Sequence, residues 1–460
     1  MDLSKIKKIY IIGIEGAGTS SLARILFDMG LDVIGSDEGD HNYYDVLMAK
    51  GINVFHKFDE KNLTKDIDFF VYSTAQKQET NPELKKALGS GKKVLSYPEA
   101  VASVFNQNYG IAVCGSHGKT TTTAWLTYVL EKTGESPKAI IGSKVPQFNG
   151  NSLSGKSDLF VLEADEYQNK LKYYDPKIVL LNNIDYDHPD FFKTPEDYEN
   201  VFIEFIKKIN KKGFLIANFD DPIIAKFARV NCRGRVIGYG VENKEADILA
   251  HDLRYEGGYQ FFKVKMKDED GYSELGEFKI RLPGLHNIYN ALAVIAAAIE
   301  LGVELKDIRG ALGEFTGTAR RMQVLGEFRG ATIIDDYAHH PTEIRATLSG
   351  ARQVYGEKKI IAVFHPHTFT RTKALLDDFA QSFKDADEVI ILDIYGSARE
   401  VQGGVHAKDL IDKIKGQEVK YIPTLDEVEK YLREHIERND VVLLMGAGDV
   451  FRVGEKLVKM

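Results

Sequence analysis

The chain contains little cysteine and no long apolar run, and each absence excludes a class of protein. Its two cysteines, Cys114 and Cys232, cannot build a disulfide framework or a four-cysteine zinc site, which favours a reducing compartment. The longest uncharged apolar stretch near a predicted helix, residues 291–299, is far shorter than the ~20 residues that a membrane span needs. We therefore expect a cytoplasmic protein with no membrane partner.

The charge balance is mildly acidic. Sixty Lys and Arg residues stand against 68 Asp and Glu residues, which gives a net charge of −8. Proteins that bind the phosphate backbone of nucleic acid usually carry a basic face, so we expect no nucleic-acid partner. Small nucleotides are still allowed as ligands, because acidic proteins bind phosphates at local sites.

The length of 460 residues predicts about three domains, because one domain usually holds ~150 residues. Buried strands alternate with helices in residues 1–107, and the pattern begins again at residues 108 and 320. This alternation is typical of mainly parallel sheets covered by helices. Residues 246–283 instead predict a small antiparallel sheet. We expect an α/β protein with domains 1–107, 108–319 and 320–460, of which the two outer ones are Rossmann-like.

The first predicted strand ends in a glycine-rich turn that contains Gly13, Gly16 and Gly18. Glycines let the backbone approach a pyrophosphate at a helix N-terminus, where free N–H groups attract anions. The spacing differs from the usual G-x-G-x-x-G. Asp37 follows 24 residues after Gly13, where dinucleotide enzymes place a ribose-binding acid. The pattern predicts a dinucleotide or nucleotide-diphosphate site; the alternative is a turn that only packs strand on helix.

A second strand, turn and helix carry Gly118-Lys119-Thr120, the core of a P-loop. The lysine supplies charge to the phosphates of a nucleotide, and the threonine hydroxyl is a ligand for Mg²⁺. Val113 stands where a strict P-loop has its first glycine. The strand before the motif and the helix after it favour a P-loop ATPase domain over a chance match.

Two further predicted strands end in segments with metal-binding side chains, residues 163–166 (EADE) and 182–188 (NNIDYDH). The carboxyl ends of parallel strands lie along one edge of the sheet, so both segments are expected to face the P-loop. We predict that Glu163 and His188 bind Mg²⁺ together with Thr120. The sequence leaves a solvated loop position equally open for their neighbours Asp165, Glu166, Asp185 and Asp187.

The P-loop and these strand ends precede two further motifs, residues 285–293 (LHNIYNALA) and 315–321 (FTGTARR). Together, and in this order, the motifs resemble those of the Mur ligases, which form amide bonds in peptidoglycan precursor synthesis. The resemblance covers nearly the whole chain. It implies ATP and Mg²⁺ as cofactors.

Two motifs in the third domain resemble those of the family member that uses L-alanine, residues 335–344 (DDYAHHPTEI) and 364–372 (FHPHTFTRT). Many members have arginine where Thr368 stands, so Arg371 becomes the candidate for the carboxylate of the amino acid. The resemblance places His339 near the amine, and a histidine of pKa ~6.5 can accept or orient a proton there. A capping or core histidine is the alternative.

The resemblance implies three substrates on three domains: UDP-N-acetylmuramate on the first, ATP with Mg²⁺ on the second and L-alanine on the third. Closure about hinges near residues 107 and 320 then keeps water from an acyl phosphate intermediate. The residues implied for the UDP-sugar are Gly16, Ala17, Gly18, Thr19, Ser20, Asp37, Ser73 and His117. Those implied for ATP are Gly115, Ser116, His117, Gly118, Lys119, Thr120, Thr121, Asn287, Asn290, Arg321 and Asp336. Those implied for catalysis are Lys119, Glu163, His188, Arg321 and His339.

Three other functions stay open on the sequence alone. The first glycine turn is compatible with a nicotinamide-dependent dehydrogenase. A Mur-like protein without catalysis and a Mur ligase that takes another amino acid or a recycled peptide are the others. Both a monomer and a homodimer are compatible with the sequence.

Overall fold

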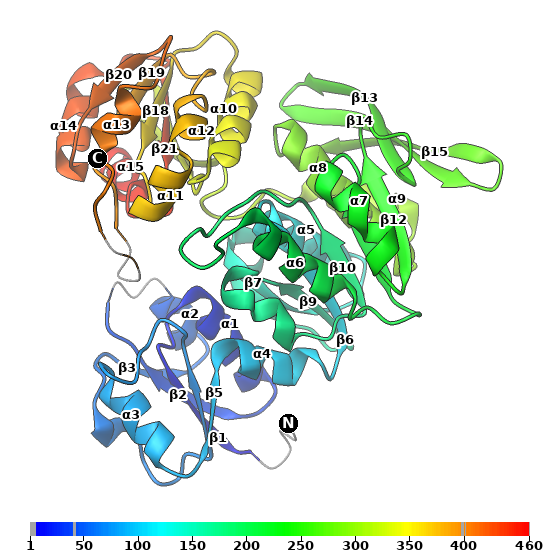
Figure 1. Cartoon of the computed structure of the whole chain (residues 1–460), viewed down its shortest axis with the longest axis vertical. Helices are drawn as coiled ribbons and strands as arrows, with labels where there is room; N and C mark the ends of the chain where they lie inside the picture. The colour runs from blue at the N-terminus through cyan, green and yellow to red at the C-terminus, as the bar shows by residue number, and fades with distance from the viewer. Residues whose placement is uncertain (1–5, 40–42, 397–399, 401, 460) are drawn as a thin grey trace.

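The computed structural model describes residues 6–39, 43–396, 400 and 402–459. The described residues form three sheets, which come from residues 8–96, 109–280 and 323–445 (Figure 1). All three sheets are mainly parallel and are covered by helices, so the predicted α/β class is confirmed. The predicted domain boundaries lie between the sheets and stay a prediction.

The N-terminal sheet is entirely parallel, with the strand order β3-β2-β1-β4-β5. Its strands are β1 (Lys8–Ile12), β2 (Asp32–Ser36), β3 (Asn53–Phe55), β4 (Phe69–Tyr72) and β5 (Lys93–Ser96). Its helices are α1 (Ala17–Asp28), α2 (Tyr44–Met48), η2 (Glu60–Asn62), α3 (Pro82–Gly89) and α4 (Tyr97–Phe105). This order places the glycine turn after β1 at the centre of the sheet's carboxyl edge, where ligands of such sheets bind.

The central sheet has ten strands in the order β15-β14-β13-β12-β11-β10-β6-β9-β7-β8. Its strands are β6 (Tyr109–Cys114), β7 (Lys138–Val145), β8 (Gly150–Ser154), β9 (Leu159–Glu163), β10 (Ile178–Leu181), β11 (Phe214–Asn218), β12 (Arg235–Gly240), β13 (Ile248–Glu256), β14 (Tyr259–Asp268) and β15 (Gly271–Ile280). The helices are α5 (Lys119–Lys132), η3 (Pro146–Phe148), η4 (Tyr167–Tyr173), α6 (Pro195–Ile206), α7 (Pro222–Asn231), α8 (Leu285–Glu300) and α9 (Leu305–Glu314). The predicted antiparallel strands β13 to β15 continue the same sheet, because β13 pairs with β12.

The C-terminal sheet has the order β16-β17-β21-β18-β19-β20, and only its edge strand β16 is antiparallel. Its strands are β16 (Gln323–Phe328), β17 (Ala331–Asp336), β18 (Ile360–Phe364), β19 (Glu388–Ile391), β20 (Glu418–Tyr421) and β21 (Val441–Met445). Its helices are α10 (Pro341–Tyr355), α11 (Phe369–Ala374), α12 (Leu376–Ala380), α13 (Ala407–Ile411), α14 (Leu425–His435) and α15 (Phe451–Val458).

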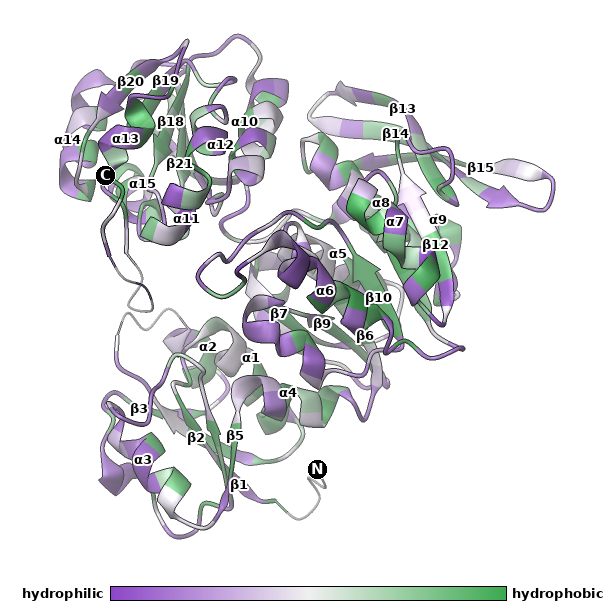
Figure 2. Cartoon of the chain, in the orientation of Figure 1, coloured by the Kyte–Doolittle hydropathy of each residue, from purple (hydrophilic) through white to green (hydrophobic). Residues whose placement is uncertain are grey.

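The hydrophobic core is continuous from the N-terminal into the central domain, whereas the C-terminal domain has cores of its own. Phe105 of α4 packs against Phe160 and Tyr174 of the central domain, at 5.6 and 5.7 Å between ring centroids. Figure 2 shows apolar strands inside and polar outer helix faces in all three domains. None of the helices in the described part of the chain has the length and apolar character needed to cross a membrane.

Strands β7 and β8 were not predicted. The sequence of β8, GNSLS, is polar and has no apolar alternation. Its Asn151 and Ser152 are nevertheless buried, because α1 of the N-terminal domain packs on this edge of the central sheet. A contact between domains therefore buries a strand that its own sequence marks as exposed.

Candidate active site

The P-loop joins β6 to α5, and its two glycines are held in conformations that favour glycine. Gly115 and Gly118 have φ angles of +126° and +78°. A Cβ on Gly115 would lie 2.9 Å from the carbonyl oxygen of Asn183, and one on Gly118 would lie 2.6 Å from Oδ1 of Asn290. Because α5 begins at Lys119, the free N–H groups of its first turn lie at the loop and form an anion site.

Lys119 is held against a buried carboxylate. Its Nζ donates to Oε2 of Glu166 at 2.9 Å and to the carbonyl oxygens of Gly115 and Ser116 at 2.6 and 3.0 Å. Glu166 is 1% exposed and also accepts from the hydroxyl of Tyr198 at 3.1 Å. Burial alone would lower the pKa of Lys119, but the charges of Glu166, Asp165 and Glu163 and the hydrogen bond to Glu166 together outweigh it and raise that pKa above its usual value. The lysine is therefore a fixed positive charge at the loop.

Thr120 and Glu163 form the predicted metal position where α5 begins and β9 ends. The Thr120 hydroxyl donates to Oε1 of Glu163 at 2.7 Å, and Oε2 accepts from the N–H of Gly142 at 2.5 Å. Adjacent ligands of an octahedral Mg²⁺ with bonds of 2.0–2.1 Å lie about 2.9 Å apart, so these two oxygens fit one edge of the octahedron. Burial raises the pKa of Glu163, a shift that a bound cation reverses.

His188, the third predicted metal ligand, lies close to carboxylates other than Glu163. Its Nε2 is 3.7 Å from Oε1 of Glu166. Asp165, Glu166 and His188 offer ligand atoms that lie within 4.8 Å of one another. The predicted metal ligands thus fall into two sets, Thr120 with Glu163 and His188 with its two acidic neighbours.

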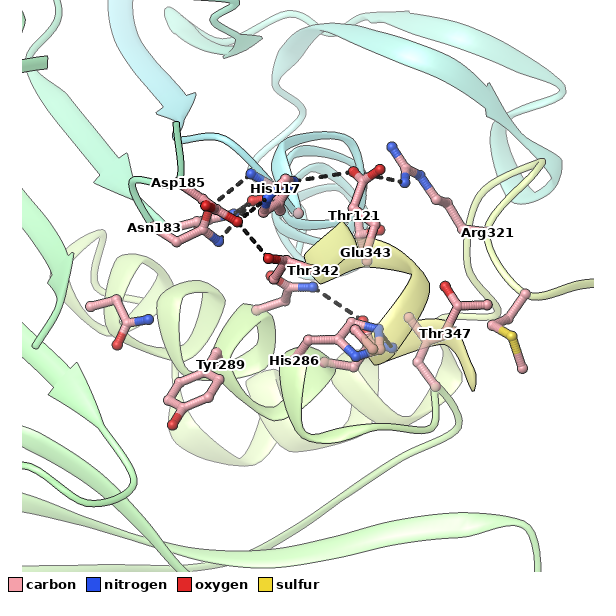
Figure 3. A pocket seen from close by; sticks show the side chains of 18 of the residues that line it. His117, Thr121, Asn183, Asp185, His286, Tyr289, Arg321, Thr342, Glu343 and Thr347 are labelled. Carbon is pink, nitrogen blue, oxygen red and sulfur yellow. Dashed lines mark hydrogen bonds and ion pairs between the residues drawn. The ribbon is translucent and has the colours of Figure 1, made fainter. Parts of the chain in front are cut away.

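A cavity of about 440 Å³ lies beside the P-loop, between the central and C-terminal domains (Figure 3). Asn287 and Asn290 of α8 border it on the central side, and Arg321 and Asp336 border it on the C-terminal side. The Asn287 amide donates to the carbonyl oxygen of Pro283 at 2.7 Å, and its Oδ1 accepts from Asn290 at 3.1 Å. The other predicted ATP residues in its wall are His117, Gly118 and Thr121.

A larger cavity, of about 690 Å³, lies where all three domains meet. Ala17 and Tyr43 contribute from the N-terminal domain, Lys119 from the central domain and His339 from the C-terminal domain. The other predicted residues in its wall are Ser116, Gly118, Thr120, Glu163, His188 and Arg321. A molecule in this cavity therefore contacts the P-loop, the predicted metal-binding side chains and the C-terminal domain at once.

The first glycine turn borders a third cavity, of about 290 Å³. Asp37 accepts from the N–H of Glu15 at 2.7 Å and so holds the turn from the end of β2. His117 borders the cavity of about 440 Å³ and not this one. The predicted residues in the wall of this third cavity are Gly16, Ala17, Asp37 and Ser73.

The other three predicted residues of this turn support the fold. The Thr19 hydroxyl donates to the carbonyl oxygen of Gly13 at 2.6 Å, and Ser20 is fully buried. A Cβ on Gly18 would lie 2.5 Å from the ring of Tyr97. The turn therefore presents its backbone to a ligand, while the side chains of Thr19 and Ser20 point into the protein.

His339 borders the three-domain cavity as a neutral imidazole. Burial lowers its pKa to about 3; Glu343 opposes this shift and Arg371 adds to it. Its Nδ1 lies 2.9 Å from the carbonyl oxygen of Tyr337, which leaves Nε2 as the free ring nitrogen. Such an imidazole can orient an amine but cannot retain its proton at neutral pH.

Arg371 is 4% exposed and already engages a carboxylate of the central domain. Its Nε and Nη2 donate to the two carboxylate oxygens of Asp187 at 2.8 and 3.2 Å. The predicted contact with an amino-acid carboxylate therefore requires Arg371 to exchange Asp187 for the substrate.

Three family models match successive parts of the chain. "Mur ligase family, catalytic domain" matches residues 8–109, "Mur ligase middle domain" matches 113–298 and "Mur ligase, glutamate ligase domain" matches 320–448. The chain belongs to the Mur ligase family. The predicted resemblance is thus confirmed, and membership in this ATP-dependent family removes the dehydrogenase alternative.

Several full-length relatives of this Mur ligase share one name. The UDP-N-acetylmuramate–L-alanine ligase of Caldanaerobacter subterraneus subsp. tengcongensis is 39% identical, over 100% of this chain and 99% of the relative. That of Alkaliphilus metalliredigens is 40% identical, over 100% and 98%. The crystal structure of UDP-N-acetylmuramate–alanine ligase from Thermotoga maritima matches with a TM-score of 0.82 and 27% identity, over 98% of both chains. A murein peptide ligase from Psychrobacter arcticus matches with a TM-score of 0.74 and 25% identity, over 98% of both.

One residue that links the sites of this Mur ligase was not predicted. Glu343 accepts from the N–H of His339 at 3.0 Å, and its other oxygen lies 3.3 Å from Nδ1 of His117 and 3.7 Å from Arg321. Figure 3 shows Glu343 between His117 and Arg321. The sequence offers only a capping signal here, an acid three residues after the cap position at His340.

Proposed function

We propose that this protein joins L-alanine to the lactyl carboxylate of UDP-N-acetylmuramate, with conversion of ATP to ADP and phosphate. Relatives with that name are 37–40% identical over nearly the full length of the chain. The observation that carries the proposal is the three-domain cavity, because Ala17, Lys119 and His339 of three different domains line it. This is the arrangement that a reaction with three substrates needs.

ATP is proposed to bind with its base in the 440 Å³ cavity and its phosphates on the P-loop. Asn287 and Asn290 offer amide groups to the adenine edge, and Asp336 accepts from ribose hydroxyls. The phosphates then replace the Glu166 contact of Lys119. Mg²⁺ would be held by Thr120 and Glu163, with His188 beside the terminal phosphate, and it supplies charge neutralisation.

UDP-N-acetylmuramate is proposed to bind with its diphosphate on the backbone of Gly16 and Ala17 at the start of α1. Asp37 and Ser73 border the same cavity. Ala17 and Tyr43 border both this cavity and the three-domain cavity, so the two are adjacent. The sugar can therefore extend from the diphosphate toward Lys119.

The reaction is proposed to form an acyl phosphate. An oxygen of the lactyl carboxylate attacks the γ-phosphorus, and the bond to the β–γ bridging oxygen breaks to leave ADP. Two anions must approach each other, so Lys119 and Arg321 stabilise the transition state by supplying positive charge. The amine of L-alanine then attacks the acyl carbon, and phosphate leaves with its electron pair.

The amino acid is proposed to lie against the C-terminal domain. The free Nε2 of His339 orients the amine, and Arg371 receives the carboxylate once it has released Asp187. The proposal places the enzyme in the cytoplasm, as its substrates ATP and a UDP-sugar indicate. Both a monomer and a homodimer are compatible with the proposed reaction.

We test the proposal by measuring ADP release from Mg²⁺-ATP and UDP-N-acetylmuramate with one amino acid at a time. Release that needs L-alanine and disappears in Lys119→Ala is the expected result. Release supported instead by L-alanyl-γ-D-glutamyl-meso-diaminopimelate would indicate the peptide-recycling alternative. No release with any amino acid or peptide would contradict the proposed substrates.

A further inference from the structure

Two histidines and an aspartate meet where the central and C-terminal domains touch, at one side of the nucleotide cavity. Nε2 of His117 lies 3.0 Å from Oδ2 of Asp185, and Nδ1 of His340 lies 3.4 Å from the same oxygen. The two imidazole rings have their centroids 4.7 Å apart. His117 and Asp185 belong to the central domain, whereas His340 is the residue before α10.

These separations match those between the ligands of a bound transition metal. Ligands at 2.0–2.1 Å from a tetrahedral Zn²⁺ lie about 3.4 Å from one another. The three residues offer ligand atoms that all lie within 4.8 Å of one another. Small side-chain rotations therefore bring all three to one ion, without a change in the backbone.

The buried imidazole ring of His340 has fewer hydrogen-bond partners than its two nitrogens can use. His340 is 3% exposed, and its Nε2 has no hydrogen-bond partner among the described residues. Its Nδ1 accepts from the N–H of Thr342 at 3.3 Å, so this nitrogen carries a lone pair and no proton. The same Nδ1 faces Oδ2 of Asp185, an acceptor that also receives the Thr342 hydroxyl at 2.6 Å. Two acceptors that face each other are stabilised by a cation between them.

We propose that His117, Asp185 and His340 form a binding site for a Zn²⁺ ion that bridges the central and C-terminal domains. Imidazole nitrogens with one carboxylate favour Zn²⁺ and similar transition metals over Mg²⁺, which prefers oxygen ligands. The ion replaces the proton that His117 now shares with Asp185. Because the ligands come from two domains, the complete site exists only while those domains are in contact.

This site is separate from the proposed Mg²⁺ position. Thr120 and Glu163 border the three-domain cavity, whereas His117 and Asp185 border the nucleotide cavity (Figure 3). The Zn²⁺ site contains none of the three predicted Mg²⁺ ligands. Zn²⁺ binding is therefore expected to persist when excess Mg²⁺ is present.

The test titrates Zn²⁺ into the full-length protein without nucleotide or other substrates. Excess Mg²⁺ and a competing chromophoric chelator are present throughout. His340→Asn is the decisive variant, because asparagine is a strong helix cap and keeps α10 in place while it removes the imidazole. We expect one Zn²⁺ per chain in the unchanged protein, and an affinity at least about 100-fold lower in His340→Asn, since losing a supporting residue alone costs 10–100-fold. A matched control, His251→Asn, removes a histidine that contacts Asp252 and Glu274 on the surface, and it leaves the affinity unchanged.

A second measurement shows which residues bind the ion. Co²⁺ is substituted for Zn²⁺, and its visible absorption is compared between the unchanged protein and the His340→Asn and Asp185→Asn variants. Loss of an intense tetrahedral spectrum in both variants, with far-ultraviolet circular dichroism showing that both are folded without metal, supports the site. Absence of stoichiometric binding, or binding that both variants retain, would overturn the proposal.

Discussion

The central domain meets its two neighbours in opposite ways. Toward the N-terminal domain it shares a continuous hydrophobic core and neutral hydrogen bonds, such as those from Ser21 to the Asn151 carbonyl oxygen at 2.9 Å and from Asn151 to the Ala17 carbonyl oxygen at 2.6 Å. Toward the C-terminal domain it presents charged side chains. Arg371 pairs with Asp187 there, and the C-terminal domain keeps separate cores.

This contrast indicates which of the two interfaces is expected to rearrange when substrates bind. An apolar contact is held by burial, and no ligand replaces it. The ion pairs at the other interface engage groups that are also proposed to bind substrates, namely His117 and Arg371. We therefore expect the hinge near residue 320 to move during the reaction and the one near residue 107 to stay closed.

The largest effect is expected from Lys119→Ala, which tests phosphoryl transfer in the cavity where the three domains meet. The variant loses the charge that stabilises the phosphoryl-transfer transition state. The rate of ADP release is expected to fall by at least about 1,000-fold, or ~4 kcal/mol. The exposed Lys430→Ala is the control and keeps the full rate. A loss of less than tenfold would show that this lysine does not act on the phosphates.

Phe105→Ala tests the apolar interface. Phe105 is fully buried against Phe160, and truncation of a buried Phe costs about 3–5 kcal/mol. Calorimetry is expected to show the N-terminal and central domains melting earlier as one transition, with the C-terminal transition unchanged. Leu88→Ala, at a side chain that is 47% exposed, leaves both transitions in place. Separate melting of the first two domains would contradict a hydrophobic core shared between them.

Asp187→Asn tests the charged interface. It leaves the buried Arg371 without its carboxylate partner, which costs about 3 kcal/mol for such pairs. Small-angle scattering is expected to report a larger radius of gyration, because the C-terminal domain moves away. Asp377→Asn, which removes an exposed ion pair within the C-terminal domain, leaves the radius unchanged. An unchanged radius in Asp187→Asn would mean that this pair does not hold the domains.

The smallest effect is expected from pH. Burial alone would lower the pKa of His117, but its hydrogen bonds to Asp185 and Glu343 outweigh this and raise the pKa to about 9. A pKa raised above the ~6.5 of the unfolded chain stabilises the contact fully below pH 6.5, and this stabilisation is lost as the pH rises through 9. Fluorescence transfer between labels on the two domains should therefore fall over that interval, because the contact of His117 with Glu343 crosses the interface and weakens as the imidazole loses its charge. A matching fall in His117→Gln would contradict this assignment.

The sequence predicted the strands that are strongly apolar runs, and missed β7 and the edge strands β3, β8, β16 and β20, whose apolar pattern is weaker. Buried strands such as β6 and β10 are continuous apolar runs, and both were predicted. β8 is polar, and α1 of another domain buries it. Glu343 likewise looks like a capping acid, and only the packing of α10 on the P-loop brings it to His117.

The site was predictable as a set of motifs but not as a set of contacts. The glycines and Lys119 of the P-loop follow from spacing after a strand. No spacing reveals that Glu166 holds Lys119 or that Asp187 holds Arg371, since each pair joins residues far apart in the chain. The lowered pKa of His339 depends on burial, which the sequence does not contain, so the sequence alone assigned this histidine the usual pKa of ~6.5.

Oxygen transfer tests the proposed ligation most directly. UDP-N-acetylmuramate with both lactyl carboxylate oxygens labelled with ¹⁸O would be incubated with ATP, Mg²⁺, L-alanine and the enzyme, and the released phosphate analysed by mass spectrometry. Attack of the carboxylate on ATP and departure of phosphate from the acyl carbon predict one ¹⁸O atom in each phosphate. Unlabelled phosphate formed together with the amide would contradict the acyl phosphate route.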